Sequence, residues 1–211
     1  MLAGEILTVE IRVIPWARRG SRNVRVGLRS NIARFLMKEA TASSPAEPLK
    51  IVTAETIAEL ISRASASPRK RMNFNLHNST DSICRFLNAG IAGTYVRPHR
   101  HQTDKWELVS VIQGQCDLLI FTSDGVVKDR IALGFGGTGV AEIPGGSWHS
   151  VVFRAPGAVV LEIKSGPYEP QIDKEFANWA PKEADPLAAQ FVRWLEVAAP
   201  GERVSSTFPS Q

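Results

Sequence analysis

The 211-residue sequence is poor in cysteine, and the two cysteines that it has form no motif. Cys84 and Cys116 stand 32 positions apart in apolar runs and have no CxxC partner, so we expect no disulfide framework. We expect instead two buried, reduced thiols in core strands and a reducing cytosol as the compartment. The sequence also lacks any run of about 18 apolar residues, which argues against a membrane-spanning helix.

The sequence has no large excess of charge of one sign: it contains 25 Lys and Arg residues and 21 Asp and Glu residues, which gives a net charge of +4. With 44% hydrophobic and 22% charged residues, the composition excludes an acidic disordered tail, a collagen-like repeat and a coiled-coil rod. Residues 1–40 alone carry eight basic and three acidic groups. The positive excess therefore lies in this segment, and we expect no nucleic-acid binding by the rest of the chain.

The sequence divides into three parts. Residues 1–48 are a basic extension that ends in a proline-containing linker, and disorder, a basic arm, an organelle presequence and sequence upstream of the true start stay open for it. Residues 49–183 are the expected main domain, which includes a helix over about 54–65. Residues 184–211 are expected to hold a second amphipathic helix over about 186–197 and a tail.

Between these two helices the sequence predicts short strands separated by turns. Apolar runs at spacings of about ten residues are typical of an all-β sandwich or barrel, and not of a helix-alternating α/β sheet. The expected strands are 83–87, 92–101, 106–113, 116–122, 126–133, 139–143, 149–154 and 158–164. Asp124 and Gly125, between two apolar runs, predict a tight hairpin.

Three of the four histidines fall into a pattern that is typical of metal binding. His99 and His101 stand two positions apart, so on a strand both side chains point to the same face. The polar stretch after them is long enough to reverse the chain and bring Glu107 to the adjacent strand, facing the same interior. His149 follows a Pro-Gly-Gly-Ser turn that presents it at the start of a later strand. Each histidine alone is more typical of a hydrogen-bonded residue, but together they predict a site for one divalent transition metal: Fe, Mn, Ni or Zn.

The spacing of these residues resembles the double motif of the cupin superfamily. Its first half runs from Gly93 through the His-Arg-His triplet and Glu107 to Gly114, with five residues between the second histidine and the glutamate, a longer spacer than is usual. Its second half keeps the Pro-x-Gly-x-x-His pattern that ends at His149, while Phe153 replaces the usual asparagine. The longer spacer lengthens a hairpin loop and leaves Glu107 able to reach the metal. The resemblance implies an all-β fold: a cupin-type double-stranded β-helix, or jelly-roll barrel, flanked by the N-terminal and C-terminal helices.

Further runs of the sequence resemble the WbuC-type cupin metalloproteins. These runs are Ala64–Phe74, Arg97–His101, Glu142–Pro144, Gly166–Pro170 and Phe176–Pro181. The similarity covers about residues 50–183 and does not include the N-terminal extension. It implies one metal in a jelly-roll barrel that is often encoded near bacterial surface-polysaccharide genes, and it supplies no reaction.

Side-chain parity adds candidates for binding a substrate. On a continuous strand over 92–101, Tyr95 and Arg97 share the face of the two histidines, so we expect both to point into the barrel. A cation inside a barrel needs an anionic partner, which for Arg97 is either Glu162 or the phosphate or carboxylate of a ligand. His77, which follows a polar-aromatic alternation, is a candidate at the pocket mouth, with a structural role as the alternative.

These observations leave the function open between classes. An enzyme would act on a small anionic or sugar-derived metabolite by isomerase, epimerase, lyase or Fe-dependent oxygenase chemistry, with catalytic residues that the sequence does not assign. The alternative is a non-catalytic sensor or binding module for a small ligand, and a storage-type cupin without a functional metal is the third reading. A homodimer that forms through exposed sheet edges also stays open.

Overall fold

The predicted N-terminal helix forms α1, Ala54–Ala66, in a computed structural model that describes residues 49–169, 173–205 and 208. Its N-cap is Thr53, whose backbone is extended and whose hydroxyl accepts a hydrogen bond from the Thr56 N–H. The Thr56 hydroxyl accepts one from the Thr53 N–H in return, so two backbone donors of the first turn are satisfied. The predicted extension and linker over 1–48 lie outside the described residues.

Two five-stranded antiparallel sheets make up the body of the described structure. The first sheet has the order β1-β2-β9-β4-β7 and the second the order β10-β3-β8-β5-β6. The strands are β1 Arg71–Asn75, β2 Ile83–Gly90, β3 His99–Arg100, β4 Glu107–Gln113, β5 Gln115–Phe121, β6 Val127–Gly134, β7 Val140–Ile143, β8 Trp148–Phe153, β9 Ala158–Ser165 and β10 Glu175–Phe176.

The order of the strands identifies the fold as a jelly roll. From β2 to β9 the chain crosses from one sheet to the other after almost every strand, so that the order β2-β9-β4-β7 faces β3-β8-β5-β6. Two sheets wound in this way are the jelly-roll arrangement of antiparallel β proteins. The predicted double-stranded β-helix with two flanking helices is confirmed.

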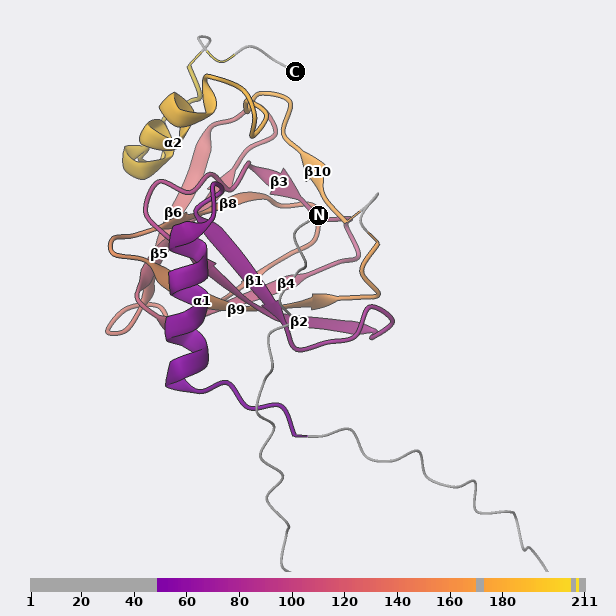
Figure 1. Ribbon diagram of the computed structural model, residues 1–211. Coiled ribbons are helices and arrows are strands. Elements are labelled where there is room, and N and C mark those ends of the chain that lie inside the picture. The colour runs from indigo at the N-terminus through magenta and orange to yellow at the C-terminus, as the bar shows by residue number, and fades with distance from the viewer. Residues whose placement is uncertain (1–48, 170–172, 206–207, 209–211) are drawn as a thin grey trace, which may run out of the picture. The chain divides into compact units, whose positions relative to one another are not determined.

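Helix α1 covers part of the outer face of the first sheet, where it contacts β1, β2 and β9 (Figure 1). Its buried residues, Leu60 and Ala64, lie one helical turn apart on the face toward the sheet. The sequence did not predict β1, which pairs with β2 at the sheet edge. Its residues alternate polar and apolar side chains, a pattern that suits an edge strand with one exposed face.

The predicted strand over 92–101 is wrong, because only His99 and Arg100 of it pair in a sheet. Gly93 has a φ of +81° in a turn, and the carbonyl of Tyr95 accepts from the Arg71 guanidinium and not from a neighbouring strand. Pro98 has no N–H with which to join a ladder. The chain therefore reaches β3 along an irregular path, and strict alternation of side chains cannot be assumed for residues 91–98.

Two hydrophobic clusters lie on opposite faces of the second sheet. One fills the barrel between the sheets and includes Leu118 of β5 and Phe153 of β8. The other covers the outer face, where Leu119 and Phe121 of β5 pack under Phe191 of α2. Helix α2, Ala188–Val197, agrees with the predicted second helix and forms a third layer on this sheet.

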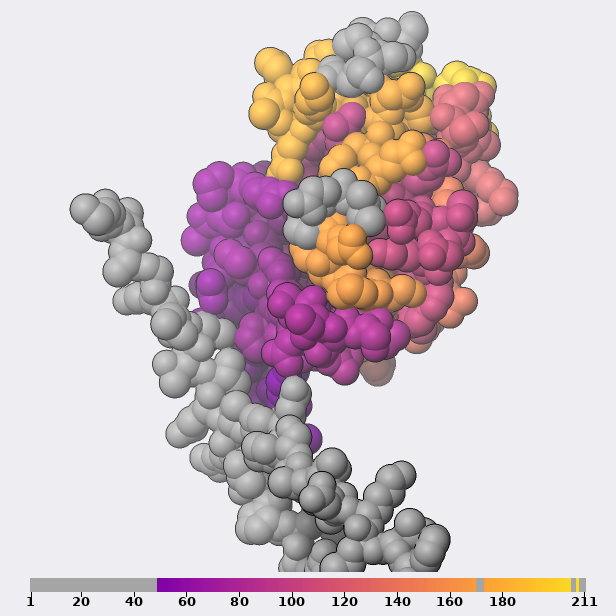
Figure 2. All heavy atoms as spheres, turned by 90° about the vertical axis from the view of Figure 1, so that its right-hand side faces the viewer, coloured from indigo at the N-terminus to yellow at the C-terminus, as the bar shows by residue number. Residues whose placement is uncertain are grey.

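Cys84 and Cys116 are buried free thiols, as expected. The hairpin at Asp124 and Gly125 joins β5 to β6, and Gly125 has the φ of +79° that a tight turn requires. No helix within the described ranges is both long and apolar enough to cross a membrane. The short strand β10 was not predicted, and it pairs with β3, so the last part of the chain lies beside the first half (Figure 2).

Arg130 of β6 connects α2 to the second sheet through hydrogen bonds. Its guanidinium donates to three carbonyls at the end of α2: Leu195 at 2.9 Å, Glu196 at 2.9 Å and Ala198 at 2.7 Å. It also donates to the buried Asp117 at 2.7 Å. A helix C-terminus has unpaired carbonyls and partial negative charge, so this cation satisfies both the helix and the carboxylate.

We expect Arg130→Met to lower the free energy of unfolding by about 3 kcal/mol, since it leaves the buried Asp117 with Arg154 as its one remaining ion-pair partner and removes the donor to three helix carbonyls. Arg203→Met is the matched control, because Arg203 pairs with Asp124 at the surface, where an ion pair contributes less than about 1 kcal/mol. Urea denaturation of both variants measures the difference. Equal losses in the two variants would contradict the role given to Arg130.

Candidate metal centre

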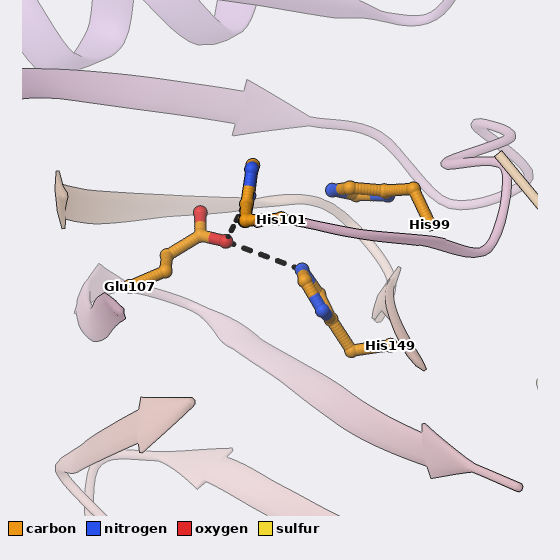
Figure 3. Close-up of side chains that lie close together, drawn as sticks. All are labelled: His99, His101, Glu107 and His149. Carbon is orange, nitrogen blue, oxygen red and sulfur yellow. Dashed lines mark hydrogen bonds and ion pairs between the residues drawn. The ribbon is translucent and has the colours of Figure 1, made fainter. Parts of the chain in front are cut away.

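The four predicted ligands come together inside the barrel from three strands and one loop. His99 lies on β3 directly opposite His149 on β8, Glu107 begins β4, and His101 follows β3. Each is at most 5% exposed. One donor atom from each residue lies within 4.8 Å of those from the other three, and Figure 3 shows the side chains facing a common centre.

Two close-packed turns bring the ligands to the same place. The loop between His101 and Glu107 reverses direction with a hydrogen bond from the Lys105 N–H to the Gln102 carbonyl. The turn before β8 packs directly on this loop, where a Cβ atom on Gly145 would lie 2.5 Å from the Gln102 carbonyl oxygen. Glycine is therefore required at position 145. The longer loop of this chain does bring Glu107 to the histidines.

Backbone carbonyls orient all three imidazole rings. Each ring places Nδ1 within hydrogen-bond distance of a carbonyl oxygen: His99 with Arg97 at 2.9 Å, His101 with Asp173 at 2.5 Å, and His149 with Ser147 at 2.9 Å. A carbonyl accepts only, so each Nδ1 carries the proton. The three Nε2 atoms are then left for the centre, which is the arrangement in which histidine binds a metal.

The Glu107 carboxylate lies at the centre of this arrangement and accepts hydrogen bonds there. Its Oε2 atom lies 2.9 Å from Nε2 of His101 and 3.2 Å from Nε2 of His149. Both rings therefore face an acceptor at each nitrogen, which only a doubly protonated ring or a cation in place of the Nε2 proton can satisfy. One divalent cation would satisfy both rings and the carboxylate together, so the residues present fit a metal.

The charges of the ligands also suit a metal. Burial acts to raise the pKa of Glu107, but hydrogen bonds with His101 and His149 outweigh it and hold the pKa well below its usual range. Burial, followed by the charges of Lys174 and His149, lowers the pKa of His99 well below its ordinary value. An ionised carboxylate and a neutral imidazole are the forms in which these groups coordinate metals.

A second buried carboxyl group, that of Glu162 on β9, lies beside Glu107. Burial, followed by the charge of Glu107, raises the pKa of Glu162 to about 8. Asn88 donates to the Glu162 Oε1 atom at 2.6 Å. Of the two alternatives for the partner of Arg97, the ion pair with Glu162 does not form among the described residues, because Glu162 lies on the first sheet and faces Glu107 and Asn88.

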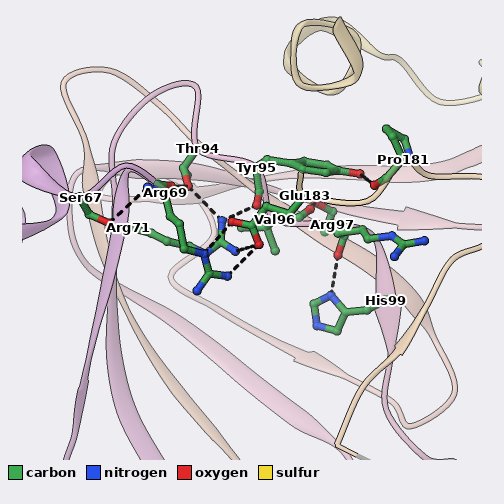
Figure 4. Close-up of polar contacts among 11 residues, drawn as sticks. Ser67, Arg69, Arg71, Thr94, Tyr95, Val96, Arg97, His99, Pro181 and Glu183 are labelled. Atoms are coloured by element: carbon green, nitrogen blue, oxygen red, sulfur yellow. Dashed lines mark hydrogen bonds and ion pairs between the residues drawn. The ribbon is translucent and has the colours of Figure 1, made fainter. Parts of the chain in front are cut away.

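Arg97 contacts the segment that carries β10. Its guanidinium lies 5.2 Å from the centre of the Phe176 ring and donates to the Ala177 carbonyl at 2.8 Å. Its Nε atom is buried and has no hydrogen-bond partner among the residues that the structure describes. Figure 4 shows the guanidinium extending away from the ring of His99. A role for Arg97 in binding an anion stays a prediction.

Tyr95 and His77 are held by contacts of their own. The Tyr95 hydroxyl donates to the Pro181 carbonyl at 2.8 Å, and its ring packs against Phe191 in the cluster under α2. The Arg85 N–H donates to Nδ1 of His77 at 3.0 Å, next to β2. These contacts are structural ones, and substrate binding by either residue stays a prediction.

Sequence reasoning missed a buried ion pair that supports His101. Lys164 of β9 lies opposite Glu107 in the sheet, and its Nζ atom is 2.6 Å from the carboxylate of Asp173. Both side chains are at most 5% exposed. Because the Asp173 carbonyl also holds the His101 ring, this ion pair fixes the backbone that orients a ligand. A charged residue at Lys164, two positions after Glu162 in an apolar run, was the available signal.

Comparison with known proteins gives a match to one family model over part of the chain. No curated protein matches the sequence. A family model described as a domain of unknown function, DUF6016, matches residues 52–133. This range holds His99, His101 and Glu107 but ends before His149, and it covers less than half of the chain.

Several solved structures resemble parts of the chain. The DMSP lyase DddQ from Ruegeria pomeroyi is 18% identical, with 47% of this chain and 48% of that chain covered and a TM-score of 0.38. KdgF from a Halomonas species is 18% identical (50% and 84% covered, TM-score 0.38), and the Cnp3 cupin domain from Schizosaccharomyces pombe is 12% identical (46% and 64% covered, TM-score 0.37). The chain spans about half the length of the DMSP lyase structures that it matches. The assignment of the jelly roll stands on the strand order of this chain and not on these similarities.

Proposed function

We propose that this chain is a WbuC-type cupin metalloprotein that binds one divalent transition metal through His99, His101, Glu107 and His149. The observation that supports the proposal is the orientation of the three rings. Their Nδ1 atoms all meet backbone carbonyls, the Nε2 atoms of His101 and His149 face the Glu107 carboxylate, and one donor atom of each of the four residues lies within 4.8 Å of the others. Three imidazoles and one carboxylate suit Fe, Mn, Ni or Zn. The donor set does not choose among these metals.

The proposed activity is that of an enzyme acting on a small anionic or sugar-derived metabolite, with a link to bacterial surface-polysaccharide synthesis. A metal bound here would polarise a carbonyl or hydroxyl oxygen of such a molecule. Glu162 holds a proton beside Glu107 and is the candidate for giving or accepting a proton at its carboxyl group. Asn88 fixes the orientation of that carboxyl group through the 2.6 Å hydrogen bond to Oε1. Isomerase, epimerase and lyase reactions need such a group, and an oxygenase reaction is the further alternative if the metal is Fe.

Metal analysis of protein purified without a histidine tag tests the proposal. We expect close to one transition metal per chain, and we expect its removal by a chelator to lower the melting temperature, because a ligand that binds only the folded state stabilises it. Protein that takes up no transition metal when each of the four candidates is added would contradict the proposal.

Turnover experiments then separate the two classes of function. Sugar phosphates and keto acids are incubated with metal-loaded protein in air and without oxygen, and products are followed by mass spectrometry. Turnover without oxygen would assign an isomerase, epimerase or lyase, and turnover only in air an oxygenase. Ligand binding without turnover of any compound would assign the non-catalytic sensor in place of the enzyme.

A further inference from the structure

A cavity of about 410 Å³ opens beside the metal centre, and His101 forms part of its wall. The other lining residues come from β3 and the loop after it, from the turn before β8, and from the segment that leads into β10: Arg100, Gln102, Thr103, Gly146, Lys174 and Glu175. A small molecule in this cavity would therefore contact one of the four proposed metal ligands.

The positive charge in this cavity is concentrated at Lys174. Arg100 is neutralised, because it makes a two-pronged ion pair with Glu175 at 2.8 and 3.0 Å. It also lies 4.6 Å from the centre of the Trp148 ring, which fixes its side chain further. Lys174 has no ion-pair partner among the described residues, so it is the lining cation free to bind an anion.

Lys174 lies next to the backbone that orients a ligand. It follows Asp173, whose carbonyl oxygen is 2.5 Å from Nδ1 of His101, and it precedes Glu175, which pairs with Arg100 of β3. An exposed ammonium group at this position would attract a negatively charged substrate to the wall that His101 helps to form.

Neutral hydrogen-bonding groups lie in the same cavity. The side chains of Gln102 and Thr103 are exposed and belong to the loop whose backbone packs against Gly145. An amide and a hydroxyl beside an ammonium group are suited to the several oxygens of a carboxylate or phosphate. Arg97 does not line this cavity, and its guanidinium is directed to the carbonyl of Ala177.

We propose that this cavity is the anion-binding part of the substrate site, where Lys174, with Gln102 and Thr103, binds the carboxylate or phosphate of a small metabolite whose neighbouring hydroxyl or carbonyl oxygen reaches the metal centre. The inference rests on the proposed function and deepens it, since it names the charged group that the substrate must carry. It also gives the role of anion anchor, which the sequence assigned to Arg97, to a residue that the sequence did not single out.

Calorimetric titration of metal-loaded protein tests the inference with three probes. Glycolate carries a carboxylate next to a hydroxyl, glycerol 3-phosphate carries a phosphate near hydroxyls, and glycolamide matches glycolate without the charge. We expect at least one of the two anions to bind, and glycolamide to bind at least about tenfold more weakly than glycolate if the site accepts a carboxylate. The anion that binds identifies the group that the site takes.

Lys174→Gln should lower the affinity for that anion by about tenfold, the effect of losing one charge-assisted hydrogen bond. Metal content should not fall in this variant, because removing a positive charge near a cation site does not weaken it. Lys128→Gln is the matched control, since Lys128 is an exposed lysine on β6. The Lys128→Gln variant should keep the wild-type affinity for the anion and the wild-type metal content.

Three results would overturn the inference: no binding of either anion to the metal-loaded protein, equal anion affinity in the wild type and Lys174→Gln, or an equal loss in Lys174→Gln and Lys128→Gln. Failure of the wild type to bind metal is a different result, which overturns the proposed function. In that case the same titrations on the metal-free protein still compare Lys174→Gln with the wild type, and equal affinities there also reject the anion site.

Discussion

Replacing Glu107 by glutamine should lower the affinity for the transition metal by more than about 100-fold while the fold is retained. The change removes the one carboxylate among the four candidate ligands and places a neutral amide next to two imidazole rings. Even residues that only orient a ligand change metal affinity by about 10- to 100-fold, so the loss of a ligand should exceed that range. Competition with a coloured chelator measures the affinity, and circular dichroism checks the fold.

Glu142→Gln is the matched control for this experiment. Glu142 is a carboxylate on the neighbouring strand β7, but it lies opposite Leu108 and is exposed on the outer face of the same sheet. The Glu142→Gln variant should bind the metal with the affinity of the wild type. Wild-type affinity in Glu107→Gln, or an equal loss in both variants, would show that Glu107 is not a ligand.

Glu162→Gln should raise the stability of the metal-free protein, and the gain should grow with pH. Glutamine has the shape of the protonated carboxyl group, so its oxygen can still accept from Asn88 and its amide can donate to Glu107. It cannot ionise, and it therefore avoids the cost of a second buried negative charge beside Glu107.

The direction in which the free energy of unfolding changes with pH follows from the two pKa values of Glu162, which are about 8 in the folded protein and 4.5 when unperturbed. Below about pH 4.5 the group is protonated in both states and contributes no difference. Between these values the unfolded chain releases the proton and the folded protein keeps it, so the free energy of unfolding falls as pH rises. The accumulated loss above pH 8 is on the order of 5 kcal/mol, which the glutamine variant should regain.

Urea denaturation of the metal-free wild type and of Glu162→Gln at pH 5, 7 and 9 measures this difference. Titrating groups that do not interact with Glu162 contribute equally in both proteins, so the comparison isolates Glu162 and its coupling to Glu107. Glu142→Gln again serves as the control, and its difference from the wild type should stay small and constant. A difference for Glu162→Gln that does not change with pH would contradict the buried, protonated state of Glu162.

Local patterns in the sequence were enough to predict most of the fold. Alternating apolar runs bounded by turn residues located seven of the eight predicted strands to within a few residues, and the 3.6-residue period located both helices. The spacing of His99, His101, Glu107 and His149 was enough to predict the cluster, because a pair two apart and a histidine after a turn fix strand faces before the fold is known.

The errors arose where distant contacts decide the local structure. Residues 91–98 leave the sheet at the Gly93 turn, and the Tyr95 carbonyl accepts from Arg71, a distant contact that no local pattern marks. The parity argument for Arg97 failed with the strand on which it depended. The contact of Asp173 with His101 could not be predicted either, because the two-residue strand β10 that follows Asp173 has no periodic signal of its own.

The dependence of the ligand rings on main-chain oxygens has a consequence for how freely this protein can change. Because residues 97, 147 and 173 orient the rings through their carbonyls, their side chains can be exchanged without turning an imidazole, provided that the backbone keeps its course. The exception is Asp173, because the ion pair of its carboxylate with Lys164 holds the backbone at this position. In a library randomised at positions 97, 147, 164 and 173 and selected for metal binding, we accordingly expect many different residues at 97 and 147. At 164 and 173 we expect few residues, mainly pairs of opposite charge.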